Sequence, residues 1–169
     1  MISQPKNEFE RMFGPYEPGH CFDLENCDVV KNAQGIKIAE FLYLNIKDNH
    51  INIAIIEAKT SIPPYDEIDA IKQKFRNSLA LFAAYYLKRH NNSSTQLPQK
   101  FHSVDFASIQ FKLVLAVQRP DQKLMPGFRD LFKKELKPIV KIWNITDLAL
   151  QVMDTEDLRK HGLINTQSE

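Results

Sequence analysis

Apolar and polar positions follow two different periods along the chain. Residues 37–46 (KIAEFLYLNI) and 50–59 (HINIAIIEAK) are rich in Ile, Leu, Phe and Tyr, a composition typical of β-strands. Asp48 and Asn49, the central residues of Lys47-Asp48-Asn49-His50, tolerate positive φ, so the pattern predicts a hairpin with a tight two-residue turn. In residues 66–90 the apolar positions recur every three or four residues instead, which predicts a long helix.

The same criteria assign the remaining segments. Shorter helices are expected at residues 5–13, 126–137 (ending before Pro138) and 155–163. Further strands are expected at residues 22–31, 108–118, 139–145 and 148–154. The order α–βββ–α–β–α–β–β–α predicts the α/β class, in its α+β form, with a mixed sheet and helices packed on its faces.

Candidate chemistry lies at the end of the most hydrophobic strand. The pattern Glu-x-Lys occurs twice, at residues 57–59 and 135–137. The second copy falls at the end of an expected helix, where charged side chains are solvated. The first copy extends the apolar face of its strand, and burying two charges without partners is costly. Glu57 and Lys59 are therefore expected to have a partner.

The hairpin register suggests that this partner is Glu40. If Asp48 and Asn49 form the turn, paired positions sum to 97, and Glu40 lies opposite Glu57. Cross-strand neighbours have Cβ atoms about 4.5–5.5 Å apart. Two carboxylates at that separation repel each other unless one is protonated or a cation lies between them. A hard divalent cation with oxygen ligands, Mg²⁺ or Mn²⁺, is the natural solution.

This arrangement resembles the PD-(D/E)XK nuclease superfamily, which has the restriction-endonuclease-like fold. An acid on one strand and Glu57-Ala58-Lys59 ending the next are followed by a helix and a buried strand. The resemblance covers an αβββαβ core at about residues 5–118, with residues 119–169 as a C-terminal β-β-α elaboration of one domain spanning 1–169. It implies metal-dependent hydrolysis of nucleic-acid phosphodiesters, of DNA rather than RNA.

The resemblance also implies residue roles. Glu40 and Glu57 would hold the metal together with the backbone carbonyl of Ala58. Lys59 would position the attacking water, or help to deprotonate it, and stabilise charge on the phosphate. Glu10 in the expected first helix matches an acid that some members carry there, but a solvated helix charge is the favoured explanation for it.

The identity of the first acid is left open by the sequence. The family usually has Asp at the position taken here by Glu40, and Asp28 in the preceding expected strand is a rival. With one bulge residue in the turn at 32–35, Asp28 falls opposite Glu40 and becomes a third ligand. Without the bulge, Cys27 takes that place.

Basic residues near these acids have two interpretations. Lys72 and Arg76 lie one turn apart on the expected long helix, where they would grip phosphates or form a solvated edge. The same two interpretations, contact with the nucleic-acid backbone or a solvated surface, apply to a second basic cluster formed by Arg129, Lys133, Lys134 and Lys137.

Composition narrows the class of protein without naming a function. The 169 residues carry 22 Lys plus Arg against 21 Asp plus Glu, so a nucleic-acid-binding surface has to be local. No apolar run reaches the roughly 20 residues that span a membrane. Two cysteines make no disulfide framework, and a reducing cytoplasm is expected.

Other functions remain open on the sequence alone. The same fold could form a non-catalytic module that binds nucleic acid or a partner protein. In an unrelated α/β protein, Glu57 and Lys59 would be a strand-end ion pair. The resemblance also allows a homodimer or the nuclease part of a larger complex.

Overall fold

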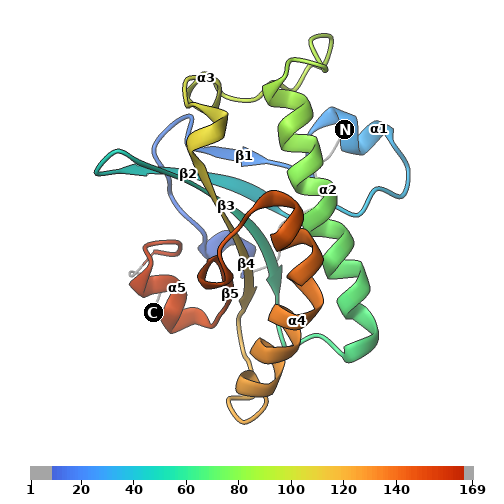
Figure 1. Cartoon of the computed structure of the whole chain (residues 1–169), viewed down its shortest axis with the longest axis vertical. Coiled ribbons are helices and arrows are strands. Elements are labelled where there is room, and N and C mark those ends of the chain that lie inside the picture. The colour runs from blue at the N-terminus through green and yellow to red at the C-terminus, as the bar shows by residue number, and fades with distance from the viewer. Residues whose placement is uncertain (1–8, 166–169) are drawn as a thin grey trace.

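A five-stranded mixed sheet forms the centre of the computed structural model, which describes residues 9–165 (Figure 1). The strands are β1 (Cys21–Asp23), β2 (Phe41–Lys47), β3 (His50–Lys59), β4 (Ile109–Val117) and β5 (Leu150–Met153). Their spatial order is β1-β2-β3-β4-β5. The pairs β1–β2 and β2–β3 are antiparallel, whereas β3–β4 and β4–β5 are parallel. The α/β architecture expected from the sequence is confirmed.

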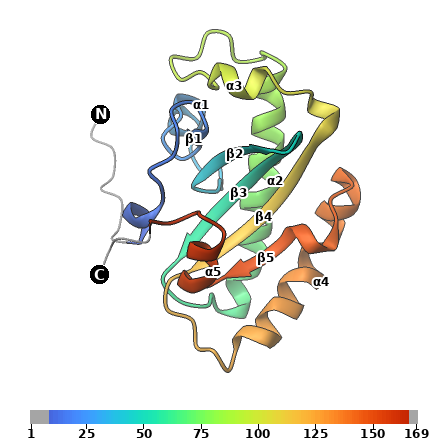
Figure 2. The ribbon, with the colours of Figure 1, turned by 90° about the vertical axis from the view of Figure 1, so that its left-hand side faces the viewer.

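Two long helices make the parallel crossovers and cover one face of the sheet. Helix α2 (Ile68–Tyr86) connects β3 to β4, and α4 (Met125–Trp143) connects β4 to β5. Three short helices are α1 (Asp28–Asn32), α3 (Gln99–His102) and α5 (Thr155–Lys160). Single 3₁₀ turns are η1 (Glu10–Met12), η2 (Tyr65–Glu67), η3 (Phe106–Ser108) and η4 (Asp147–Ala149). Helix α5 lies on the opposite face from α2 and α4 (Figures 1 and 2).

The hairpin between β2 and β3 has the predicted register. Lys47 pairs with His50 and Leu42 with Ile55, so paired positions sum to 97. The turn residues Asp48 and Asn49 have φ of 50° and 64°, the left-handed conformation that such a turn requires. This register directs the isoleucines of β3 and the leucines of β2 to the same face.

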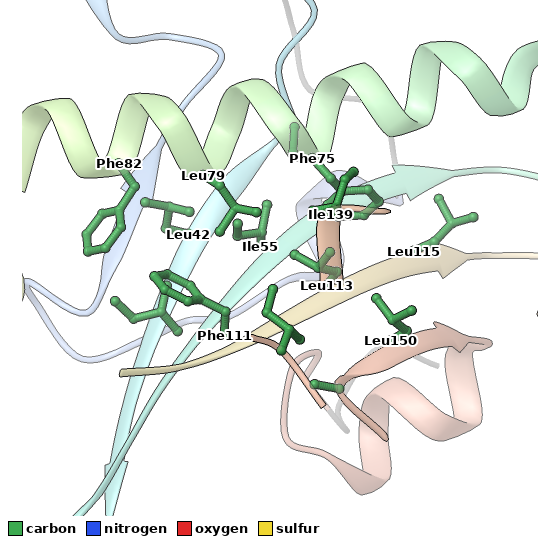
Figure 3. Close-up of a cluster of buried hydrophobic side chains, with 14 of the residues drawn as sticks. Leu42, Ile55, Phe75, Leu79, Phe82, Phe111, Leu113, Leu115, Ile139 and Leu150 are labelled. Carbon is green, nitrogen blue, oxygen red and sulfur yellow. The ribbon is translucent and has the colours of Figure 1, made fainter. Parts of the chain in front are cut away.

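The main core lies between the sheet and the two long helices. Figure 3 shows Phe75, Leu79 and Phe82 of α2 pointing onto Leu42 and Ile55 of the hairpin. Each fully buried side chain of this size contributes about 2 kcal/mol through burial alone. A smaller cluster on the opposite face buries the other side chains of the sheet beneath η1, α5 and the segment that follows α5; its members include Phe9, Ile56, Val114, Met153, Leu158 and Leu163.

The strand expected at residues 22–31 is wrong beyond its first two residues. Strand β1 ends at Asp23 because the Asp23 carboxylate accepts hydrogen bonds from Asn26, at 3.0 Å from the backbone N and 2.8 Å from Nδ2. Such a side-chain turn competes with sheet pairing. The chain then forms α1. Of the helix expected at residues 5–13, the described part contains only the 3₁₀ turn η1, and residues 5–8 lie outside the described residues.

The helix expected to stop before Pro138 and the strand expected at 139–145 form one helix instead. Helix α4 passes through Pro138 and ends at Trp143. Pro138 is exposed, so water can satisfy the carbonyl that loses its N–H donor. The apolar positions Ile139, Val140 and Trp143 continue the helical stripe that includes Leu136.

The remaining expected elements are confirmed in type, with shifted ends. Strand β4 and helix α2 fall within their expected ranges, and β5 and α5 are shorter than expected. None of the helices in residues 9–165 is long and apolar enough to cross a membrane.

Candidate active site

Glu57 is a buried acid at the carboxyl end of β3. Its side chain is 0% exposed and lies on the sheet face that α2 covers. Lys74 of α2 donates a hydrogen bond from Nζ to Glu57 Oε1 at 2.6 Å. Lys59 Nζ lies 3.7 Å from the same oxygen and 3.9 Å from Glu67 Oε2. The buried carboxylate therefore faces two ammonium groups.

Burial and ion pairing act in opposite directions on these groups. Burial raises the pKa of Glu57, although Lys74 and Lys59 favour its ionised form. For Lys74, burial lowers the pKa, but the charge and hydrogen bond of Glu57 outweigh it and leave the pKa raised. The second oxygen of Glu57, Oε2, is buried and has no hydrogen-bond partner among the described residues.

Glu40 lies near Glu57, but the two residues are not paired as predicted, because the β2–β3 ladder stops one position before them. The β2–β3 ladder begins at Phe41 opposite Ile56, and Glu40 donates its backbone N–H to Ile56 O at 2.9 Å. The Glu40 carbonyl accepts from the N–H groups of Leu24 at 3.0 Å and Glu25 at 3.4 Å. The backbone thus bends at Glu40 toward the segment after β1, which brings Glu25 to the site.

A cluster of acids holds Glu40 in its neutral form. Burial, a hydrogen bond with the Glu25 carboxyl group, and the charges of Glu25, Glu57 and Glu10 raise the pKa of Glu40 to about 9. Like charges cannot all ionise in a partly dry site, so one takes a proton. The charge of Glu57 contributes to the raised pKa of Glu40, as expected for two carboxyl groups that lie near each other.

The Ala58 carbonyl also faces this position. Successive carbonyls of a strand point to opposite sides, and those of Ile56 and Lys59 bond toward β2 and β4 respectively. The Ala58 carbonyl is consequently directed to the β2 side, past the end of the ladder. The N–H of Ala39, which would continue that ladder, donates instead to Ser78 Oγ of α2 at 3.0 Å.

Asp28 lies in a different part of the molecule from Glu57. It is the first residue of α1, where its carboxylate accepts hydrogen bonds from Ser93 Oγ and from Ser94 N at 2.7 Å. These bonds lower its pKa, with the Ser93 bond the main cause. Tyr85, near the carboxyl end of α2, lies 3.4 Å away. The structure therefore does not bring Asp28 to Glu40 as a ligand, because the strand that was to carry it does not form.

The predicted phosphate-binding pair also points away from Glu57. Lys72 bonds to Glu135 of α4 at 3.1 Å and to Asp69 at 3.3 Å, and Arg76 is exposed. Lys74, between them in sequence, is the α2 residue that reaches the site.

The sequence reasoning overlooked Lys74 and Glu25. Lys74 is half-buried, three residues after buried Ile71 and four before buried Ser78, so it lies on the helix face toward the sheet. That spacing was a usable signal. No sequence signal indicated Glu25, because its position depends on the unexpected turn after β1.

The donor set fits a hard divalent cation in its chemistry. Glu57 Oε2 is a buried carboxylate oxygen without a hydrogen-bond partner in the described part of the chain, and burial and the neighbouring acids raise the pKa of Glu40. Within residues 9–165, no three acidic, histidine or cysteine side chains already converge as a metal cage. Binding would require Glu40 to lose its proton. Mg²⁺ keeps several of its waters and needs only one or two carboxylates.

Comparisons with known proteins give a distant structural likeness. No protein-family model matches the chain, and no curated protein matches it in sequence. The fold is similar to the solved structure of restriction endonuclease FokI bound to DNA, with a TM-score of 0.39 and 11% sequence identity. The similarity covers 79% of this chain but only 22% of that chain. Because the likeness is distant, we base the function on the geometry of the site itself.

Proposed function

We propose that the chain is a Mg²⁺- or Mn²⁺-dependent nuclease. Its catalytic site, built around Glu57, would hydrolyse the phosphodiester bonds of nucleic acid. One observation carries the proposal: Glu57 is a fully buried strand-end carboxylate whose Oε2 has no hydrogen-bond partner within residues 9–165, and it lies beside a lysine that reaches solvent. A buried acid of this kind is costly unless it has a function or a compensating ligand.

Glu57 and Glu40 are the proposed metal-binding side chains, with the Ala58 carbonyl as a third oxygen donor. A bound divalent cation would lower the pKa of its water and neutralise charge on the phosphate. Ser78 serves as a positioning residue, because it accepts from Ala39 N and donates to Lys74 O at 2.6 Å. It thereby ties the residue before Glu40 to the helix that carries Lys74.

The two lysines have separate proposed roles. Lys59 is 30% exposed, so its ammonium can donate to an attacking water or to a phosphate oxygen while Glu57 and Glu67 orient it. Lys74 donates to Glu57 Oε1 and stabilises the ionised carboxylate. Oε2 is left for the cation.

DNA is the proposed substrate, and a homodimer or a larger complex the proposed assembly, on the resemblance alone. A reducing cytoplasm is the proposed location, and no disulfide involves Cys21 or Cys27 in the described part of the chain.

A non-catalytic nucleic-acid- or protein-binding module is the second candidate. The observation that favours it is that Lys74 pairs with Glu57 at 2.6 Å and compensates the charge of the buried carboxylate. Such a module would bind its partner in EDTA and would not cleave it.

The experiment is a cleavage panel of plasmid, linear duplex, single-stranded DNA and RNA with Mg²⁺, Mn²⁺ or EDTA. The wild type is expected to cut in divalent metal, and Glu57→Gln to lose at least about 100-fold, since even outer-shell changes cost 10–100-fold. Glu135→Gln, which alters the other Glu-x-Lys, is the matched control and should retain activity. Folded wild-type protein that cuts none of these substrates would favour the second candidate. Cleavage that survives Glu57→Gln would refute the site.

A further inference from the structure

Within residues 9–165, no helix covers one part of the sheet face opposite α2. The turn η1, helix α5 and the residues after it cover the carboxyl-terminal half of β3 and β4 (Figure 2). The other half displays polar side chains from four strands. We call this surface the open sheet face; its residues are Tyr43, Asn45, Asn52, Gln110, Lys112 and Gln151.

The strand register arranges these side chains in rows. Asn45 pairs with Asn52, and Asn52 pairs with Gln110, so three amides lie side by side across β2, β3 and β4. Neighbouring strands are about 4.8 Å apart, which makes this row about 10 Å wide. In the next row, the small side chain of Ala54 lies between Tyr43 and Lys112 and leaves a hollow.

Cavities open around Gln151 at the edge of this surface. Three neighbouring cavities of about 280, 50 and 480 Å³ all have Gln151 in their walls. The side-chain oxygen of Gln151, Oε1, is buried and has no hydrogen-bond partner within residues 9–165. A ligand that donates a hydrogen bond there would satisfy it.

Lys112 is the one charged residue among the six of the open sheet face, so this surface is weakly positive. Lys112 is half-buried, and no carboxylate of the described residues lies within 4 Å of its ammonium. Arg129 and Lys133 line the cavity next to Gln151. Asp157 is the one acid among the described lining residues of the three cavities, and it is already paired with Arg129 at 3.1 Å. An anionic ligand fits this balance.

We propose that the open sheet face binds a single-stranded segment of nucleic acid. Amide side chains both donate and accept, so Asn52, Gln110 and Gln151 can bond the edges of unpaired bases. Lys112 can contact the backbone phosphate. The ring of Tyr43 is already stacked on Tyr16, with ring centroids 4.4 Å apart, so it is not counted as a stacking surface for a base. In a duplex the Watson–Crick edges are occupied by pairing, so a ligand bound through those edges is single-stranded. The site lies on the opposite face of the sheet from Glu57 and needs no metal.

The test measures binding of fluorescent 12-nucleotide DNA and RNA strands, and of a duplex, by anisotropy in EDTA at low salt. Single strands are expected to bind. Lys112→Gln and Gln151→Met should each weaken binding about tenfold, the size expected for a lost hydrogen bond to a charged or buried group. Lys112→Gln should also lower the salt slope by about 0.7, one phosphate contact. The control is Lys31→Gln, which removes the same positive charge from an exposed lysine on α1.

The tryptophan of the chain gives a second readout. Trp143 lines the largest of the three cavities and packs on Phe111 with ring centroids 5.8 Å apart. Its emission should change on addition of single strands and not of duplex. Failure of the wild type to bind, equal binding of duplex, or equal losses in Lys112→Gln and Lys31→Gln would overturn the proposal. Glu57→Gln should bind normally, which separates this site from the proposed nuclease site.

Discussion

The chain contains the same three-residue pattern in two surroundings, and only one of them is unusual. Glu57 and Glu135 are each followed two residues later by lysine, and each glutamate bonds to a lysine of α2. The distances are 2.6 Å for Lys74–Glu57 and 3.1 Å for Lys72–Glu135. The lysines are 21% and 22% exposed, but the glutamates are 0% and 22% exposed.

This difference shows that burial, and not the pattern or the ion pair, distinguishes the two glutamates. Glu135 has water as an alternative partner, so its ion pair is of ordinary strength. Glu57 has no such alternative, and one of its oxygens lacks a partner within residues 9–165. Lys59 lies against this carboxylate, whereas Lys137 is an exposed helix residue.

The largest expected effect comes from removing the lysine of each pair. Lys74→Met leaves Glu57 buried without its ammonium, and we expect the free energy of unfolding to fall by about 3 kcal/mol at pH 8. Lys72→Met removes an ion pair whose two side chains are each 22% exposed, and it should lower the free energy of unfolding by at most about 1 kcal/mol. Urea unfolding followed by circular dichroism measures both. Equal losses in the two variants would contradict the distinction made from burial.

The same comparison applies to the lysine of each tripeptide. Lys59→Gln removes a donor beside the proposed reaction centre and should lower metal-dependent cleavage by about 100-fold. Lys137→Gln should leave the rate within about twofold of wild type, because Lys137 is exposed on α4. Initial rates on the best substrate of the cleavage panel measure this. A normal rate in Lys59→Gln would remove Lys59 from the mechanism.

The acids around Glu57 predict a pH dependence that the Glu135 region lacks. The pKa of Glu40 is about 9 in the folded protein and 4.5 in its unperturbed state, so the folded chain holds an extra proton between these values. Stability therefore falls as the pH rises from about 5 to 9, by at most about 1.4 kcal/mol per pH unit. Glu40→Gln cannot ionise and should flatten this slope.

Unfolding in urea at pH 5, 7 and 9, with EDTA present, tests the Glu40 prediction, and Glu135→Gln is the control that should keep the wild-type slope. An unchanged slope in Glu40→Gln would mean that Glu40 is not the neutral acid. If metal affinity were also unchanged in that variant, Glu57 and Lys59 would be a simple strand-end ion pair.

The smallest effect is expected at Ser78. Ser78→Ala deprives the buried N–H of Ala39 of its acceptor and should cost about 1 kcal/mol. Ser103→Ala removes an exposed bond to Gln99 O and should cost less. Thermal unfolding compares them. A loss in Ser103→Ala as large as that in Ser78→Ala would show that Ser78 does not hold the segment before Glu40.

Much of the candidate site was predictable because it depends on a single hairpin. A two-residue turn at Asp48-Asn49 determines the register up to the pair Phe41–Ile56, and Glu40 and Glu57 are the residues that adjoin this last pair. The burial of Glu57 followed from the apolar strand that it ends. Lys74 was missed among three nearby cations on α2, although its position three residues after Ile71 places it on the helix face toward the sheet.

The errors in the fold have local physical causes. Asp23 ends β1 through a side-chain turn, which displaces Asp28 to a helix near Ser93 and Ser94. Pro138 predicts the end of a helix, but it lies on the exposed side of α4, which continues through it. The apolar pattern records neither the side-chain turn that ends β1 nor the exposure of Pro138, and these two features determine where the elements end.

Direct titration of Mn²⁺ tests the central claim, that the buried Glu57 is a cation site and Glu135 is not. Electron paramagnetic resonance of Mn²⁺ would be recorded for the wild type, Glu57→Gln and Glu135→Gln at pH 8. The wild type and Glu135→Gln should bind one ion with equal affinity, and Glu57→Gln at least about tenfold more weakly. Equal Mn²⁺ affinity in all three proteins, or none in the wild type, would contradict the claim.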